Sequence, residues 1–448
     1  MKPLKRHDLH NELVRHLRQP EKILVVEGVR QTGKTTAIQM ALAGMPHTFV
    51  TLSDEDFPII QLREAASFDE FTRELYRHFG WKAAGGTPLV IDEAQRSTHL
   101  YGFIMQMARE WPNVPVILSG SVMGAFFTRP ENKKVVSPAG RVRTLVCRPF
   151  SFFEFLEWVG EAAVLEELQT FHLGKTISAS LHNRATALFY EYMTCGGFPE
   201  AIAHRHSTEQ LYTYFQTLLS FFWQDADRYL TEILESEKYQ YGSLMQVIFK
   251  AVALHTTSAT KRSTLLSTDS PAYRLILPGL LDAMERWHFL FRLPTEMNSM
   301  TTKQGFSSKK YLWDVGIVNH FINLSRPADH GSDPVLFGKL LETYVAQELV
   351  GALKTVDRLG SWKSQQKQTS ELDFIAHFPL QDIPVEVKAS RNMNQKAISQ
   401  LREYVSRHPH GRYFVVYMGE CARTMLGDKP IWWIPPYLLP LIDQKEGV

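Results

Sequence analysis

The sequence predicts an α/β protein with three successive parts: a parallel sheet, a mainly helical region and a smaller α/β unit. Short apolar runs alternate with helical segments up to about residue 150, which indicates a parallel sheet. Beyond that point, aromatic and apolar residues recur at helical spacing. After a break at residues 327–334, a strongly amphipathic helix precedes three short strands, which indicates a separate α/β unit.

Length and composition narrow the class of protein. The chain has 448 residues, enough for roughly two to four domains. Hydrophobic residues make up 44% and charged residues 21% of the chain, values that exclude a disordered or fibrous protein. The formal net charge is only +2, so no overall field drives the chain onto nucleic acid, and any basic surface must be local.

Cysteine usage and apolar segments bear on cellular location. Cys147, Cys195 and Cys421 lack the CxxC spacing of a zinc site or redox motif, so we expect free thiols in a reducing compartment. The first residues lack the apolar core of a signal peptide, and no apolar run is long enough to span a membrane. We therefore expect a cytoplasmic protein without membrane contact.

The elements follow in order along the chain. A helix is expected at residues 8–18, followed by strands at 23–26, 49–52, 89–91, 114–118 and 142–146. Helical residues then extend to about 235 and are broken at Cys195-Gly196-Gly197-Phe198-Pro199. Helices near 244–252 and 275–287, with strands near 289–293 and 309–313, would fit a winged helix, and helical packing without a wing fits them nearly as well.

The last unit is expected to contain a helix at 336–349 and strands at 372–375, 385–387 and 413–417. These patterns divide the chain into residues 1–160, a helical region at 161–235, a possible winged helix at 236–328 and a terminal domain at 329–448.

A phosphate-binding loop follows the first strand. The pattern Gly28-x-x-x-x-Gly33-Lys34-Thr35 stands between a buried strand and a helix, as a P-loop requires. Its backbone N–H groups would point at the phosphates of ATP, Lys34 would reach the β- and γ-phosphates, and Thr35 would bind Mg²⁺. The residues expected to contact nucleotide are Gly28, Val29, Arg30, Gln31, Thr32, Gly33, Lys34, Thr35 and Thr36.

A second strand supplies acids for the same site. Residues 88–91 are apolar and end in Asp92 and Glu93, the form of a Walker B strand. Asp92 would hold Mg²⁺ through water, and Glu93 would act as the general base on the attacking water. Strand 114–118 ends at Ser119-Gly120-Ser121, where a serine could sense the γ-phosphate or cap a helix. Arg141 is a candidate for stabilising transition-state charge, from its own or a neighbouring subunit.

These segments together resemble a known group of proteins. The segments GVRQTGKTT, LVIDEAQ, LSGS, GRVRTLVCRPFSFFEFLEW, CGGFPEA and KKYLWDVGI, with the terminal ELDF and VEVK, resemble prokaryotic AAA-type ATPases that carry a restriction-endonuclease-like C-terminal domain. The resemblance implies an AAA-type core, a winged-helix middle and a nuclease-like end. Two departures stand out: Ser119 occupies a position where the family often has threonine, and Pro278 interrupts the helix that would read DNA.

The terminal acids fit the PD-(D/E)XK nuclease pattern. Glu386 and Lys388 lie on one face of a strand because side chains alternate, and Asp373 on the neighbouring strand would reach the same place. The two carboxylates would bind Mg²⁺ and the lysine would assist an attacking hydroxide. Glu342, on the preceding helix, resembles the helical acid of such nucleases and would add a ligand. An exposed sheet edge with the same composition remains the alternative.

Two other groups of residues have simpler explanations. The aromatic residues at 150–158 are better explained by packing than by base stacking. Lys309 and Lys310 could touch phosphate, although two such lysines usually form a solvated face.

We expect an ATP hydrolase whose ATP- and ADP-bound states move the C-terminal domains, acting on or near nucleic acid. Two alternatives are an ATP-gated metal-dependent nuclease and an ATP-binding switch that acts on a protein partner with little turnover. The oligomeric state is left open.

Overall fold

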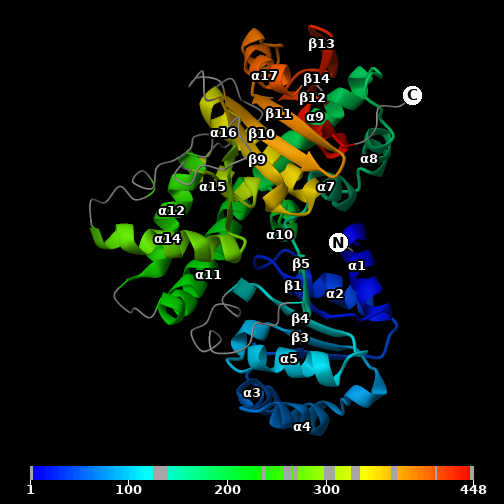
Figure 1. The fold of residues 1–448 in the computed structure, drawn as a ribbon, viewed down its shortest axis with the longest axis vertical. Coiled ribbons are helices and arrows are strands. Elements are labelled where there is room, and N and C mark those ends of the chain that lie inside the picture. Colours follow the sequence, from blue (N-terminus) through cyan, green and yellow to red (C-terminus); the bar gives the residue numbers. More distant parts are fainter. Residues whose placement is uncertain are drawn as a thin grey trace. The chain divides into compact units, whose positions relative to one another are not determined.

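The structure is a computed structural model that describes residues 4–124, 140–234, 239–255, 265, 271–296, 308–323, 333–364, 371–408 and 411–443. The chain forms two compact units (Figure 1). Unit 1 comprises Met1–Arg148, Ser220–Ser243 and Pro278–Phe289; unit 2 comprises Pro149–Leu219, Leu244–Leu277 and Leu290–Val448. The four-part division at finer scale stays a prediction, and its boundaries at 235/236 and 328/329 lie outside the described residues.

Unit 1 is built on a five-stranded sheet of order β2-β3-β4-β1-β5. Its strands are β1 (Ile23–Glu27), β2 (Thr48–Thr51), β3 (Leu89–Asp92), β4 (Val116–Gly120) and β5 (Val142–Val146). Every neighbouring pair is parallel, which confirms the predicted parallel α/β sheet. Each carboxyl end therefore faces the same edge, where ligands bind in such sheets.

Helices cover both faces of this sheet (Figure 1). They are α1 (His7–Arg18), α2 (Lys34–Leu42), α3 (Phe57–Glu64), α4 (Phe68–Phe79) and α5 (Leu100–Glu110), with short 3-10 turns at Ala83–Gly85 and Ala94–Arg96. Leu24 and Val26 of β1 pack in one apolar cluster with α1 and α2, whereas Ile23 and Val25 pack in the other with α3, α4 and α5. This alternation follows from the two-residue period of a strand and explains the continuous apolar run in the sequence.

His16 is buried between α1 and the sheet. Its side chain is 3% exposed, and Nε2 lies 3.1 Å from the carbonyl oxygen of Val116. Burial, assisted by Arg143, lowers the pKa of His16 from 6.5 to about 4, although the contact with Val116 opposes the shift. Above pH 6.5 the ring is neutral in both the folded and the unfolded chain, and between 6.5 and about 4 only the unfolded chain takes up the proton.

We predict that His16 destabilises unit 1 progressively as the pH falls from 6.5 to about 4. The loss should reach about 3 kcal/mol at the acid end, because one pKa unit corresponds to about 1.4 kcal/mol. Urea unfolding of the wild type and His16→Gln at several pH values checks this. Relative to the wild type, the free energy of unfolding of His16→Gln should rise as the pH falls toward 4. If the two proteins lose stability in parallel, the prediction is contradicted.

The helical part of unit 2 begins at Pro149. Its helices are α7 (Phe152–Trp158), α8 (Ala162–Gln169), α9 (Ala179–Cys195), α10 (Pro199–Ala203) and α15 (Val315–Ile322). Helix α9 ends at the Gly196-Gly197 pair, where the sequence predicts the break. The aromatic segment packs within this unit, with Phe152 and Phe155 against Tyr192.

Three helices pass from one unit into the other. These are α11 (Thr208–Leu234), α12 (Tyr241–His255) and α14 (Pro271–Arg286). Helix α14 continues through Pro278, so the prediction that this proline interrupts the helix is wrong. No helix of the described residues combines the length and apolarity that crossing a membrane requires.

The rest of unit 2 contains two sheets. Strands β6 (Leu290–Leu293) and β8 (Lys309–Leu312) form an antiparallel pair. A seven-stranded mixed sheet has the order β13-β14-β12-β11-β10-β9-β7. Its strands are β7 (Thr295–Glu296), β9 (Leu359–Lys363), β10 (Glu371–Phe378), β11 (Gln381–Lys388), β12 (Tyr413–Tyr417), β13 (Ala422–Leu426) and β14 (Lys429–Ile434).

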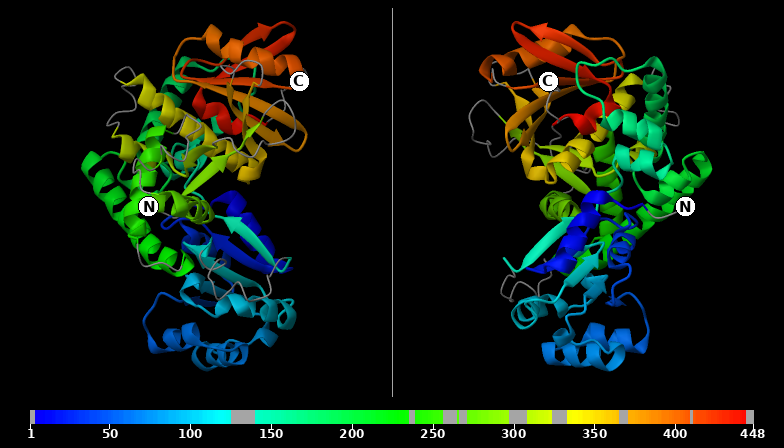
Figure 2. Two further views of the ribbon diagram at one scale, coloured as in Figure 1. Left: turned by 60° about the vertical axis from the view of Figure 1, so that its left-hand side comes forward. Right: turned by 90° about the vertical axis from the view of Figure 1, so that its right-hand side faces the viewer.

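Two helices accompany the larger sheet. Helix α17 (Gln395–Arg407), orange in Figure 2, packs its apolar residues on the sheet through Leu401 and Tyr404. Helix α16 (Pro334–Leu353) is buried along most of its length and contacts β10 and β11. Short 3-10 turns at Val356–Arg358 and Pro436–Leu441 complete the unit.

Asp314 joins two segments that are distant in the sequence. Its carboxylate is fully buried, caps α15 by accepting from the N–H of Ile317 at 3.1 Å, and accepts from the N–H of Gly197 at 2.8 Å. A Cβ at Gly196 would lie 2.2 Å from Asp314 Oδ1, so only glycine fits there. Burial raises the pKa of Asp314 to about 6 despite the N–H donors.

We predict that Asp314→Ala lowers the free energy of unfolding by about 3 kcal/mol, since it removes a helix cap and leaves buried N–H groups without acceptors. Asp333→Ala is the matched control, because Asp333 caps α16 from a partly exposed position. The control should cost about 1 kcal/mol. If denaturant unfolding shows the same loss of stability in both variants, the burial of Asp314 makes no contribution beyond that of an ordinary helix cap.

Candidate active site

The loop after β1 has the geometry of a phosphate cradle. Gly28 has φ 140°, and a Cβ there would lie 2.2 Å from the carbonyl oxygen of Cys147 at the end of β5. Gly33, at φ 90°, immediately precedes α2, and nothing lies within 4 Å of the position its Cβ would take. The loop therefore packs tightly against β5 at its start and is open where the helix begins, so that N–H groups can face a phosphate.

Lys34 points into its own loop. The side chain is 6% exposed, and Nζ donates to the carbonyl oxygens of Gly28 and Val29, each at 2.8 Å. Burial lowers the pKa of Lys34. Thr32 is buried and donates its hydroxyl to Val29, whereas Gln31 and Thr36 are exposed. The ammonium thus lies inside the loop in which phosphate oxygens would be bound.

Asp92 brings three predicted site residues together. Its Oδ2 accepts from the Thr35 hydroxyl at 2.8 Å, and its Oδ1 accepts from the Ser119 hydroxyl at 2.5 Å. Asp92 and Ser119 are buried, and β4 lies between β1 and β3, which places Ser119 between the loop strand and Asp92. A Mg²⁺ ion would fit the Thr35 and Asp92 oxygens, which are ligands of the type that magnesium prefers.

Glu93 lies next to this group in an unusual conformation. Its φ is 53°, in the left-handed region that non-glycine residues seldom adopt and that often marks functional sites. Gln95, fully buried and not predicted from the sequence, donates from Nε2 to Glu93 Oε2 at 2.6 Å and lies 3.4 Å from the Ser121 hydroxyl. The amide of Gln95 therefore contacts the carboxylate of the predicted general base.

Arg30 connects the loop to α11. Its guanidinium donates to both carboxylate oxygens of Asp225, at 2.7 and 2.9 Å, and Asp225 is buried. This paired geometry is the strong form of an ion pair. The hydrogen bonds to Asp225 raise the pKa of Arg30. Sequence spacing gives no sign of the contact, because 195 positions separate the partners.

Arg141 lies at the other edge of the sheet. Strands β1 and β5 run parallel, with Val146 opposite Glu27 beside the loop and Val142 opposite Ile23. Arg141 precedes Val142 and is exposed. The structure therefore does not bring Arg141 to the loop of its own chain, and a role in a neighbouring subunit stays a prediction.

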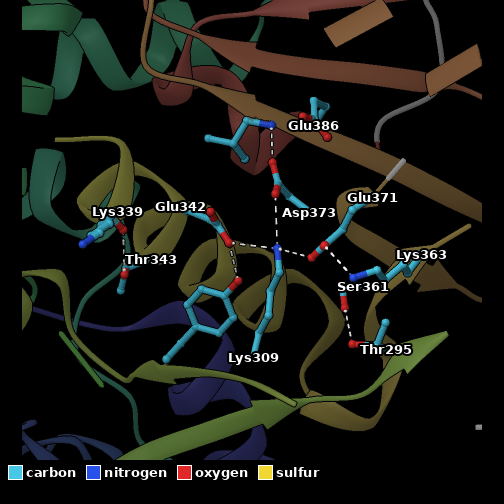
Figure 3. A network of polar contacts seen from close by, with 12 residues as sticks. Thr295, Lys309, Lys339, Glu342, Thr343, Ser361, Lys363, Glu371, Asp373 and Glu386 are labelled. Atoms are coloured by element: carbon cyan, nitrogen blue, oxygen red, sulfur yellow. Dashed lines mark hydrogen bonds and ion pairs between the residues drawn. The ribbon is translucent and has the colours of Figure 1, made fainter. Parts of the chain in front are cut away.

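The C-terminal acids gather around a buried lysine (Figure 3). Lys309 Nζ lies 3.2 Å from Glu342 Oε1, 3.2 Å from Asp373 Oδ1 and 3.5 Å from Glu371 Oε1. Its side chain is 1% exposed. The expectation of a solvated face at Lys309 and Lys310 is wrong, since both are buried and Lys310 donates to the carbonyl oxygen of Ser308.

Glu386 and Lys388 complete this group, which we name the carboxylate cluster. Lys388 donates to Glu386 Oε1, whereas Glu386 Oε2 is buried without a hydrogen-bond partner. Asp373 Oδ2 accepts from the N–H of Val387 at 3.0 Å. The members are the carboxylates of Glu342, Glu371, Asp373 and Glu386 and the ammonium groups of Lys309, Lys363 and Lys388.

Burial governs the ionisation of the carboxylate cluster. It raises the pKa of Glu342 to about 7 against the effect of Lys309, and with the help of Asp373 it raises the pKa of Glu386 to about 8. Burial alone would lower the pKa of Lys309, but the surrounding carboxylates outweigh it and raise that pKa. In the described part of the chain, no three His, Cys, Asp or Glu side chains have the arrangement of a metal site.

A parallel sheet, a glycine loop with an inward-pointing lysine and the Thr35–Asp92 pair define a P-loop ATPase. An AAA domain model matches residues 20–156, so this part of the chain is an AAA domain. Residues 337–436 match a domain of unknown function (DUF4143). That domain model assigns no activity to these residues, and the nuclease-like interpretation stays a prediction.

Two solved structures are similar to this chain at low sequence identity. The Walker-type ATPase PABY2304 of Pyrococcus abyssi is 14% identical, with a TM-score of 0.42 over 72% of this chain and 99% of that chain. A RuvB variant of Thermotoga maritima is 16% identical, with a TM-score of 0.28 over 64% of this chain and 90% of that chain. No curated protein is significantly similar to the chain.

We predict that Gly28→Ala abolishes nucleotide binding, because its Cβ would lie 2.2 Å from a backbone oxygen at a φ of 140°. Gly44→Ala is the matched control: Gly44 also has positive φ, 79°, but nothing lies within 4 Å of its Cβ position. The control should cost about 1 kcal/mol of stability and keep its affinity. Fluorescent-nucleotide titration of both variants checks this, and retained binding by Gly28→Ala would contradict it.

Proposed function

We propose that this protein hydrolyses ATP with Mg²⁺ at the loop 28–36. The observation that supports this best is the position of Asp92, whose carboxylate accepts from Thr35 of the loop helix and from Ser119 of the intervening strand. Elements that are far apart in the sequence thus present the groups that nucleotide hydrolysis needs at one edge of the sheet.

Each residue has a definite role in this reaction. The loop N–H groups and Lys34 hold the phosphates, while Thr35 and Asp92 hold Mg²⁺, which when bound neutralises phosphate charge. Glu93 accepts a proton from the water that attacks the γ-phosphorus, the bond to the β-phosphate oxygen breaks, and ADP and phosphate leave. Ser119, which donates to Asp92, senses whether the γ-phosphate is present.

Phosphate release with Mg²⁺ tests the proposal. The wild type should turn over ATP, and Glu93→Gln should lower the rate about a hundredfold or more, because the base is lost while the shape is kept. Lys34→Ala should also weaken binding. Glu110→Gln, at an exposed pair with Arg109, should match the wild type. Background rates in all four proteins would refute hydrolysis.

We further propose that nucleotide state reaches unit 2 through α11. Arg30 lies in the loop that would bind phosphate, and its partner Asp225 lies on α11, a continuous helix that belongs to unit 2 up to Leu219. A change at Arg30 on binding or hydrolysis would therefore act directly on a rigid element that enters unit 2.

Hydrogen exchange provides the test of this coupling. ATP should change protection in residues 208–219 of the wild type, and Arg30→Gln should lose at least half of that change while still binding nucleotide. Arg63→Gln is the control, because Arg63 pairs with the exposed Glu55 at 3.2 Å. An unaltered response in Arg30→Gln would exclude this route.

The expected action on or near nucleic acid rests on the family resemblance. Lys309 and Lys310 are buried, so the two lysines considered for phosphate contact do not support it. Binding of DNA that weakens steeply with salt and raises ATP turnover would favour a nucleic-acid target. Salt-insensitive association would instead favour a protein partner.

A slow ATP-binding switch is the second candidate, and the contact between Gln95 and Glu93 favours it. An amide that donates to the carboxylate at 2.6 Å competes with the water that the base must bind. If Gln95 competes with the water in this way, ATP turnover is slow in the wild type and rises in Gln95→Ala. A fall in turnover would show that Gln95 orients the base instead.

A further inference from the structure

The nuclease resemblance implies a divalent cation among Glu342, Asp373 and Glu386, and the structure has a different cation in that region. Lys309 Nζ contacts Glu342 Oε1 and Asp373 Oδ1, each at 3.2 Å, from a side chain that is 1% exposed (Figure 3). Mg²⁺ binds carboxylate oxygens at about 2.0–2.1 Å. An ion bound to these two oxygens on the side of Lys309 would overlap the ammonium, so both cannot be present there together.

Part of the hydrogen-bonding capacity of the acids is also used. Glu342 Oε1 accepts from the hydroxyl of Tyr311 at 2.6 Å in addition to Lys309, and Asp373 Oδ2 accepts from the N–H of Val387 at 3.0 Å. Glu386 Oε1 accepts a hydrogen bond from Lys388. A metal at these oxygens would have to compete with the internal donors.

The charges of the carboxylate cluster nearly balance without a metal. Four carboxylates face the ammonium groups of Lys309, Lys363 and Lys388. A divalent ion added to this set would have to enter a group that already holds most of its compensating charge. Buried acids need such compensation, since an unpaired buried charge is strongly unfavourable.

The position of Lys309 is fixed by its strand. Lys309 pairs with Leu293 in the β6·β8 ribbon, and Tyr311, two residues later on the same strand, also contacts Glu342. Two residues on one face of β8 therefore bind the same acid. Lys309 cannot leave the carboxylates by a simple rotation into solvent, because its side chain is enclosed.

Glu386 supplies an oxygen that would become relevant to metal binding if Lys309 were removed. Glu386 Oε2 is buried and has no hydrogen-bond partner, although Glu386 is 1% exposed. Without the ammonium, the freed oxygens of Glu342 and Asp373 would join this unpartnered oxygen. Carboxylate oxygens are the ligand type that suits Mn²⁺ or Mg²⁺.

We infer that the ammonium of Lys309 replaces a divalent cation beside Glu342 and Asp373, so that the carboxylate cluster is a metal-free centre. Unit 2 then keeps the acids of the nuclease pattern but excludes the metal that these acids would bind. Metal-dependent cleavage of DNA is absent from the wild type for this reason. The inference is independent of ATP hydrolysis in unit 1.

Mn²⁺ titration of the full chain, freed of metal and nucleotide and followed by electron paramagnetic resonance, tests the inference. The wild type and Asp373→Asn should bind equal amounts of Mn²⁺, since only unit 1 contributes. Lys309→Met, which keeps most of the length of the side chain without its charge, should bind one more ion per chain. Adding Asp373→Asn to Lys309→Met should remove that ion.

Lys310→Met is the matched control: the neighbouring lysine, also buried, donates to the Ser308 carbonyl oxygen, and its loss should leave Mn²⁺ binding at the wild-type level. A wild-type site that disappears in Asp373→Asn would overturn the inference. A folded Lys309→Met that gains no ion would also overturn it. If Lys309→Met fails to fold, the comparison of wild type with Asp373→Asn still decides whether the native cluster excludes metal.

Discussion

The buried ammonium of Lys309 is an interaction on which several elements of unit 2 depend. It connects β8, α16 and β10, three segments that approach one another only in the folded chain. Removing one partner of such a buried group typically costs about 3–5 kcal/mol, because the remaining charges lose both water and compensation. A lysine in this position therefore stabilises the fold only while the carboxylates are in place, and each of them depends on it in turn.

Asp314 gives the helical part of the same unit a comparable constraint. A carboxylate accepting from N–H groups of two separate segments fixes their separation, and the glycines around it remove the side chains that would prevent the approach. Unit 1 uses Asp92 in a similar way, where one acid accepts from two hydroxyls. In all three places a buried charge with several partners determines how elements meet.

The features predicted correctly from the sequence are those with a local cause. The strand, glycine loop and helix around Lys34 are encoded in consecutive residues, and apolar runs mark the strands of a sheet covered on both faces. Strands β9, β13 and β14 were not predicted. In β13 (Ala422–Leu426) the apolar residues do not alternate strictly with polar ones, so its sequence has no clear strand pattern. The helix through Pro278 shows tertiary packing overriding a local preference.

The site was only partly predictable for a different reason. Glu93 could be identified from its position after an apolar strand, but Gln95 and Asp225 became visible only through contacts. Lys309 was misinterpreted because a pair of lysines before a strand is usually exposed, and burial of one depends on acids 33 and 64 positions away. The composition of a sequence does not identify acids that meet a lysine only in the folded chain.

Unit 1 is assembled from three separated stretches, and this has a consequence for biosynthesis. Strand β5 ends at Val146, yet Asp225, which binds Arg30, and Trp287, which lies against Gly124, belong to the same unit. Chains emerge from the ribosome N-terminal end first. The nucleotide-binding unit therefore cannot complete its packing until residue 289 has been translated, well after the sheet itself has left the ribosome.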